Sequence, residues 1–287
     1  MPLSEQVKEI INSKGSKNSK KKSLLSIGVT DYEANLLLAN IVTNRGERLS
    51  FTFGVEIECL ARQYSVVQYA NENELPIHYE SYNHRDNTTY FKFVTDASIV
   101  GANGIECVSP ILKGKGGFKL LENACKTLND AGAVVNRSTG LHVHIGASDL
   151  TGVQYVNVFK NYQKLEKVID TFMAQSRRAN NSQWCHTLQN VDFDYCTTQK
   201  SVELRMNSDR YYKVNPMSWL RHRTIEFRQH QGSTDFKKIS MWVNFCAKLV
   251  NYSKKHLLTS EITRIEDIPF LNKKEKDFFT ERKNTLM

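Results

Sequence analysis

The chain has 287 residues, of which 40% are hydrophobic and 24% charged, a globular composition that can bury a substantial core in one elaborated domain or in two. No apolar run approaches the roughly 20 residues that a membrane span requires, and the first residues do not resemble a signal peptide, so we expect a soluble, cytoplasmic protein. The six cysteines lack C-x-x-C spacing, which argues against a disulfide framework and predicts reduced thiols.

The formal net charge of +9 is concentrated near the N-terminus, where six lysines fall in the first 22 residues against two acids. Segment 13–23 predicts a flexible basic linker between helices expected over residues 4–12 and 31–43, with Asp31 as the N-cap of the second helix. We favour a solvated tether over a segment that binds an anionic partner such as nucleic acid. Residues 1–48 are therefore expected to precede the main domain.

From Leu49 the hydrophobic periodicity switches to two, which predicts a strand through Cys59. Its apolar residues share one face, whereas Glu56 and Glu58 share the other. Two carboxylates side by side are costly unless a cation lies between them or water covers them. This strand is therefore the first candidate for a functional site.

Two shorter strands follow, over residues 90–94 and 105–109. Asp96 and two glycines form turn material between them, and Glu106 is the one inward acid of the second strand, which Pro110 ends. A helix is predicted over residues 118–128, and a further strand begins at 133–135.

A strand over residues 141–145 has the same alternation, with His142 and His144 on one face. Another strand, over 224–230, is predicted to hold three polar residues on one face: Glu226, Arg228 and His230. One sheet whose inner face carries the three polar strands would form a site for metal and phosphate.

Two long helices are predicted in the second half of the chain, over residues 153–175 and 236–252. The first leads to Arg177 and Arg178. Residues 180–215 show no clear periodicity and receive no assignment. The charged tail is expected to form a small helix.

Each polar pair is weak evidence alone, since acids are common on exposed strand faces and paired histidines can be structural. Together they are more specific. Carboxylates outnumber histidines and no cysteine stands at ligand spacing, which suits Mg²⁺ or Mn²⁺ better than structural zinc. Arg228 lies two residues beyond Glu226 and is interpreted either as a group that stabilises a transferring phosphoryl or as a plain ion-pair partner.

The order of these motifs resembles the putative amidoligase family, which groups with glutamine synthetase and glutamate-cysteine ligase as carboxylate-amine ligases and includes many phage-encoded members. The resemblance covers roughly residues 49–250. It rests on six segments: Phe53–Glu58, Asp96–Ile99, Gly104–Leu112, Thr139–Gly146, Ser176–Asn180 and Thr224–Gly232.

The resemblance implies an α+β fold, a glutamine synthetase-like curved antiparallel β-sheet that forms a funnel with helices packed on its outer face. Residues 49–258 would be the catalytic domain and 259–287 a helical tail. It also implies ATP and two or more Mg²⁺ or Mn²⁺ ions. ATP would phosphorylate a substrate carboxylate, and an amine would attack the acyl phosphate to give an amide, in the cytoplasm of a phage-infected bacterial host.

The resemblance also assigns metal ligands. Glu56, with His142 and Glu226, would hold the metal that activates phosphoryl transfer. Glu58 and Glu106 would hold the metal at the carboxylate and amine end. Glutamine synthetase has a further acid a turn after the equivalent of Glu106, whereas residues 110–113 here read Pro-Ile-Leu-Lys. The second metal site is therefore expected to be poorer or to be completed by Asp96.

The remaining roles concern phosphate and substrate. His144 would contact ATP phosphate, and Arg228 the transferring phosphoryl or the carboxylate, so that Arg228 would join Glu56 and Glu226 as a catalytic residue. Three further arginines are candidates for binding phosphate or carboxylate: Arg177, Arg178 and Arg223.

The leading hypothesis is thus an ATP- and Mg²⁺-dependent carboxylate-amine ligase. Its partners would be ATP, a carboxylate substrate and an amine acceptor, either a small molecule, a protein or a modified nucleic acid. A metal-dependent hydrolase or nuclease is one alternative, because Glu and His ligands also activate water. A basic nucleic-acid-binding module with structural acids and histidines is another.

Overall fold

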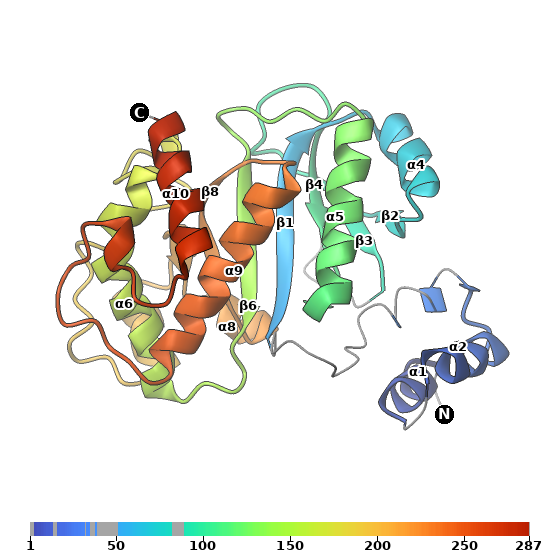
Figure 1. Ribbon diagram of the computed structural model, residues 1–287, viewed down its shortest axis with the longest axis horizontal. Coiled ribbons are helices and arrows are strands. Elements are labelled where there is room, and N and C mark those ends of the chain that lie inside the picture. The colour runs from blue at the N-terminus through green and yellow to red at the C-terminus, as the bar shows by residue number, and fades with distance from the viewer. Residues whose placement is uncertain are drawn as a thin grey trace. The chain divides into compact units, whose positions relative to one another are not determined.

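The computed structural model describes residues 3–13, 16–31, 33–34, 38, 51–81 and 89–286. The chain folds as two compact units, Met1–Val134 and Val135–Met287. Both combine helices with strands (Figure 1), so the expected α+β class is confirmed. The funnel-shaped sheet and the domain limits at residues 48 and 258 stay predictions.

The first unit begins with two helices, α1 (Leu3–Asn12) and α2 (Lys17–Ser26). The first confirms the helix expected over 4–12, but α2 lies where a flexible linker was predicted, and that prediction was wrong. Ser16 caps α2 by accepting a hydrogen bond from Ser19 N at 3.2 Å, and Leu24 is fully buried in a small apolar cluster with Val29. The N-cap and the buried leucine stabilise a helix in this lysine-rich segment, although its composition alone predicts a flexible, solvent-exposed linker.

The helix expected over residues 31–43 is described only in part. Asp31, Glu33, Ala34 and Leu38 are helical, and its other residues lie outside the described residues. The predicted N-cap is one residue too late. Thr30 forms the capping box instead, since its hydroxyl accepts from Glu33 N at 3.2 Å while the Glu33 carboxylate accepts from Thr30 N at 3.0 Å.

The strands of the first unit lie in the order β2-β3-β4-β1, with β5 also paired to β1. The pair β2–β3 is parallel, and the other pairs are antiparallel, as expected. Their bounds are Thr52–Leu60 for β1, Ile77–Tyr79 for β2, Phe91–Thr95 for β3, Gly104–Val108 for β4 and Leu112–Lys113 for β5.

Two further helices complete the first unit, α4 (Gln63–Glu72) and α5 (Gly114–Asp130), which lie beside each other (Figure 1). Helix α5 includes the predicted 118–128. Helix α4 was not predicted, because it buries only Val66 and Ala70 and so has a weak apolar stripe. The strand expected at 133–135 is reduced to a single bridge, in which Leu60 and Val134 exchange backbone hydrogen bonds.

The second unit has an antiparallel group of strands in the order β6-β8-β7. Helix α9 lies over β6, and α10 packs against α9 through Phe245 and Phe279, whose ring centroids are 5.5 Å apart (Figure 1). The bounds are Gly140–Gly146 for β6, Gly152–Thr171 for α6, Gln175–Arg177 for the short 3₁₀ helix η1, Gln199–Arg205 for α7, Val214–Asn215 for β7, Ser218–His222 for α8, Thr224–Gln231 for β8, Phe236–Ser253 for α9, Ile265–Asp267 for η2 and Lys273–Thr285 for α10.

The segment 180–215, which periodicity left unassigned, is held by buried polar groups. Lys213 is fully buried on the segment, and its Nζ lies 2.8 Å from Glu166 Oε1 and 2.7 Å from Asp170 Oδ1, both on α6. Glu166 also accepts from Leu188 N at 2.8 Å. These ion pairs add to buried apolar residues such as Leu188 and Phe193, whose irregular spacing leaves no periodic signal in the sequence.

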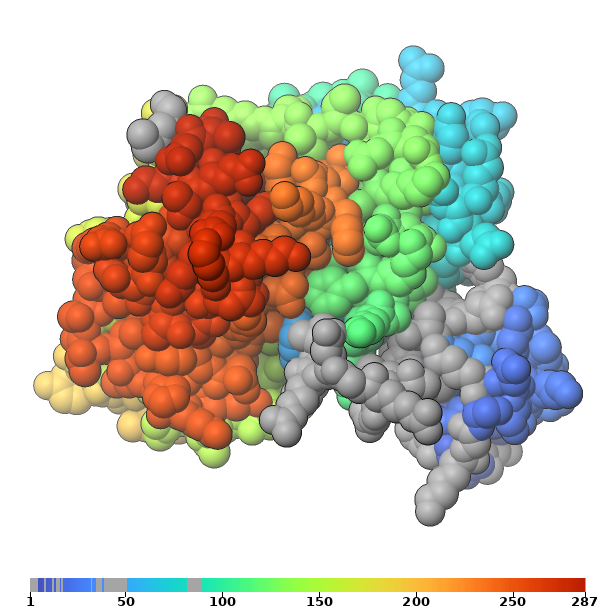
Figure 2. Space-filling view, in the orientation of Figure 1, coloured from blue at the N-terminus to red at the C-terminus, as the bar shows by residue number. Residues whose placement is uncertain are grey.

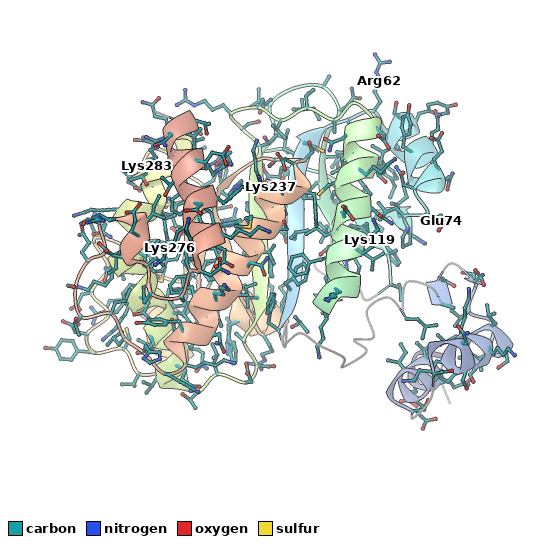
Figure 3. All side chains as sticks on the ribbon, viewed as in Figure 1. Arg62, Glu74, Lys119, Lys237, Lys276 and Lys283 are labelled. Carbon is teal, nitrogen blue, oxygen red and sulfur yellow. The ribbon has the colours of Figure 1, made fainter. Side chains whose placement is uncertain are left out.

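Positive charge is not confined to the N-terminal helices. Figure 3 shows Lys237 on α9 together with Lys276 and Lys283 on α10, and in Figure 2 the C-terminal segment forms the surface beside α9.

Among the described helices, none has the length and apolar character needed to cross a membrane.

Candidate functional site

Strands β1 and β4 bring acids together on one face of the first unit. Glu58 lies directly opposite Glu106, and both side chains are buried, whereas Phe53, Val55 and Ile57 fill the apolar face of β1. The alternation predicted for β1 is therefore confirmed. Burying like charges directly opposite each other costs free energy, which indicates that a cation or another counter-charge belongs here.

Asp96 completes this group. It follows β3 in a turn that its own carboxylate stabilises by accepting from Ser98 N at 2.7 Å. One carboxylate oxygen each from Glu58, Asp96 and Glu106 lie within 4.8 Å of one another. We call these three residues the carboxylate cluster. An all-oxygen donor set fits Mg²⁺, Mn²⁺ or Ca²⁺.

Lys92 is a residue of this face that the sequence analysis missed. In the sheet, Val108 of β4 pairs with Lys92 of β3 on one side and with Glu56 of β1 on the other. The three side chains therefore point to the same face of the sheet. Lys92 is 5% exposed. A buried ammonium on an acid-rich face supplies counter-charge. The signal was present in the sequence as one lysine among the apolar residues of β3, which is an unusual place for it.

The cysteines behave as core residues. All six are buried free thiols, which confirms the prediction. Burial, with a smaller contribution from Glu58, raises the pKa of the Cys59 thiol to about 12, and burial also raises that of Cys107. Both thiols are therefore neutral at physiological pH and pack as small apolar groups.

A second polar group lies on β6, β8 and β7 in the second unit. Glu226 lies opposite His144 on one side and Asn215 on the other. Its Oε2 accepts from Asn215 Nδ2 at 2.6 Å, and its two carboxylate oxygens lie 3.9 Å from His142 Nδ1 and from His144 Nε2. We call His142, His144, Glu226 and Arg228 the histidine–glutamate cluster.

Arg228 contributes the cation of this cluster. Its Nη1 lies 2.5 Å from Glu226 Oε1, and its guanidinium lies over the Tyr211 ring at 5.8 Å from the centroid. Both side chains of the pair are about 6% exposed. The charged and amide donors hold this buried carboxylate in one position, as a metal ligand or a phosphate-site residue requires. An ion pair with a glutamate was one of the two interpretations of Arg228, and the observed partner is Glu226 on the same strand.

A β-bulge corrects the prediction for His230. Opposite the single residue His142, β8 contributes two residues, Arg228 and Gln229. The extra residue reverses the alternation, so that His230 lies opposite Leu141 on the apolar face. The prediction that His230 faces the site with Arg228 was wrong, because a sequence pattern does not reveal a bulge.

The buried position of His230 predicts a pH effect on stability. Burial, helped by the nearby Arg282, lowers its pKa well below the ordinary value, so this histidine is neutral in the folded chain. His230 therefore does not destabilise the fold above the unfolded pKa of roughly 6.5. Below that pH, the free energy of unfolding falls by up to about 1.4 kcal/mol per pH unit, because the unfolded chain binds a proton that the folded chain does not. Urea unfolding of His230→Asn between pH 7 and 5 should show a shallower loss than the wild type. His256→Asn, at an exposed position, should keep the wild-type slope; equal slopes for all three proteins would contradict this prediction.

The three candidate arginines have different surroundings. A Cβ added to Gly140 would lie 3.2 Å from Arg177 Nη2 and 3.3 Å from His142 Nε2, so the buried Arg177 guanidinium adjoins His142. Arg178 instead donates to the carbonyl oxygens of Met173 and Leu286. Arg223 ends α8 in the left-handed region with φ 54°, and its exposed guanidinium stacks on Trp219. Arg177 is therefore the arginine of the three that these contacts join to the histidine–glutamate cluster.

A family model described as a putative amidoligase enzyme matches residues 49–250. The matched range contains the carboxylate cluster, the histidine–glutamate cluster and Arg177, and it leaves α1, α2 and α10 outside. This match confirms the resemblance found in the order of the motifs. No curated protein matches the chain.

Proposed function

The chain belongs to the putative amidoligase family, and on that premise we propose that it is an ATP-dependent carboxylate-amine ligase that uses Mg²⁺ or Mn²⁺. In the proposed reaction a carboxylate oxygen of the substrate attacks the γ-phosphorus of ATP and ADP leaves. An amine then attacks the acyl carbon, inorganic phosphate leaves, and the amine loses a proton. Phosphorylation is needed because a carboxylate is a poor electrophile and phosphate is a good leaving group.

The observation that supports this proposal most is the carboxylate cluster. Glu58, Asp96 and Glu106 would hold a divalent ion, which supplies positive charge that neutralises phosphate and orients the substrate carboxylate. Asp96 takes the place of the further acid that glutamine synthetase carries after the equivalent of Glu106. Burial of the two glutamates keeps water from screening their charge.

The histidine–glutamate cluster would act on phosphate. We propose that Arg228 stabilises the charge of the transferring phosphoryl while Glu226 holds the guanidinium in place, and that His144 contacts ATP phosphate. Glu56 would serve with His142 and Glu226 as ligands of the metal that activates phosphoryl transfer, as the family motifs imply. Arg177, beside His142, would bind phosphate or the carboxylate, and Arg178 and Arg223 stay weaker candidates for that role.

The direct test is a coupled measurement of ADP and amide. The purified chain is incubated with ATP, Mg²⁺ and a pool of amines and carboxylates, and products are identified by mass spectrometry. We expect ADP release that depends on a carboxylate, with amide appearing in equal amount. Hydrolysis by the metal-loaded chain without ATP would instead support a hydrolase.

The carboxylate cluster makes a separate prediction about metal binding. Calorimetric titration of the wild type with Mn²⁺ should show a site that Glu58→Gln weakens at least tenfold, because the variant removes one charged ligand of three. Glu74→Gln is the matched control, since Glu74 is an exposed glutamate of the same unit that follows α4 (Figure 3). If Mn²⁺ binds Glu58→Gln as tightly as the wild type, the carboxylate cluster is not the metal site.

A further inference from the structure

A pocket of about 700 Å³ lies in the second unit. Six of its lining residues carry hydrogen-bonding side chains: Asn136, Arg137, Gln175, Ser176, Asn181 and Gln231. The pocket lies between the loop that leads into β6, the short helix η1 and the end of β8. Its volume is in the usual range for small-molecule sites.

The pocket adjoins the histidine–glutamate cluster. Gln231 lies opposite Gly140, and Gly140 shares a strand face with His142, two residues or about 7 Å along β6. Arg177 lies between them, because its guanidinium contacts Gly140 and donates to Thr139 O at 2.8 Å. A ligand in the pocket could therefore extend one group toward His142.

The loop geometry of the pocket is fixed. Gly232 N donates to Thr139 O at 2.9 Å, and a Cβ added to Gly232 would lie 2.2 Å from Thr139 Oγ1, so only glycine fits there. Asn136 accepts from Ser138 N at 2.8 Å, and Gln231 accepts from Ala174 N at 3.3 Å. Gln231 thus uses its oxygen to hold the pocket wall and keeps its –NH₂ group for a ligand or water.

The charge of the lining decides which substrate fits. The lining residues, all within the described part of the chain, include one cation, Arg137, and no acid. Arg137 is exposed and forms no ion pair with any described residue. A cationic amine would be repelled here, whereas a carboxylate would gain charge-assisted hydrogen bonds from the guanidinium.

The amide side chains of the lining indicate more closely which class of substrate fits the pocket. Carboxamides donate and accept side by side, which matches the N–H and C=O groups of a peptide. A nucleobase also offers donors and acceptors, but sites for bases add an aromatic platform, and this lining has none.

We infer that this pocket binds a short peptide with a free carboxyl terminus, which the proposed ligase would use as its carboxylate substrate. The inference rests on the proposed function for the chemical step but not for binding. Arg137 would bind the terminal carboxylate. The amide side chains would form hydrogen bonds with the adjoining peptide groups. The pocket thereby separates the carboxylate substrate from the amine acceptor.

Isothermal titration calorimetry without ATP or metal tests this inference. The probes are N-acetyl-trialanine and its C-terminal amide, which differ only in the carboxylate. We expect the acid to bind the wild type at least tenfold more tightly than the amide, and Arg137→Gln to abolish that difference. Arg264→Gln makes the same charge change at an exposed position outside the pocket and should preserve the difference.

Three results would overturn the inference: equal binding of acid and amide by the wild type, a difference that survives in Arg137→Gln, or tighter binding of cytidine monophosphate than of the peptide. Because ADP release is measured separately, the two proposals fail separately. Peptide binding without turnover would contradict the ligase, and amide synthesis without peptide binding would contradict the pocket assignment.

Discussion

A Glu226→Gln variant is expected to lower the rate of ADP release at least about a thousandfold, which corresponds to about 4 kcal/mol of transition-state stabilisation. The substitution keeps the shape of the side chain and removes its charge. Arg228 then loses its carboxylate partner at 2.5 Å, and the phosphate site loses both a fixed guanidinium and a proposed metal ligand. The effects of substituting residues that act as a unit are rarely additive. Adding Arg228→Gln to the Glu226→Gln variant should therefore lower the rate of ADP release little further.

The measurement is the initial rate of ADP release under saturating ATP and Mg²⁺, with folding checked by circular dichroism. Glu275→Gln is the matched control, because Glu275 is also a buried glutamate in an ion pair, with Lys248 at 2.6 Å, but lies on α10 outside the matched family range. It should keep the wild-type rate. A Glu226→Gln rate within tenfold of the wild type, in a folded protein, would falsify the role of this cluster in the reaction.

The sequence predicted the site well where a strand is regular. On β1 the alternation placed Glu56 and Glu58 on one face, a prediction that needs only the period of two and the identity of the residues. Arg228 was placed beside Glu226 by the same rule. For the second metal site, the family resemblance left two possibilities, a poorer site or one completed by Asp96, and Asp96 lies in the carboxylate cluster.

The remaining site features depend on structure that no local pattern records. The bulge at Arg228 and Gln229 removed His230 from the site, because one extra residue reverses every later position on the strand. Lys92 was not predicted as a site residue, because its position beside the acids depends on the register between β3 and β4. The pocket at Arg137 and Gln231 brings together residues almost 100 positions apart, which one sequence cannot place.

The buried ion network around Lys213 carries the second large prediction. Lys213→Met is expected to lower the free energy of unfolding by about 3–5 kcal/mol, because it leaves the buried Glu166 and the partly buried Asp170 near each other without their cation. The change also reaches the site, since Arg228 N donates to Lys213 O at 2.9 Å and this backbone contact places the strand that carries Arg228.

Urea unfolding followed by tryptophan fluorescence measures the loss. Lys248→Met provides the comparison: its ion pair with Glu275 is equally short, but its side chain is 37% exposed, and the expected loss is below about 1 kcal/mol. A triple variant, Lys213→Met with Glu166→Gln and Asp170→Asn, should recover part of the stability, because it removes the uncompensated charges while methionine fills the volume of the lysine stem. If Lys213→Met costs no more than Lys248→Met, buried charge does not hold segment 180–215 in place, and its order must come from the apolar contacts of residues such as Leu188 and Phe193.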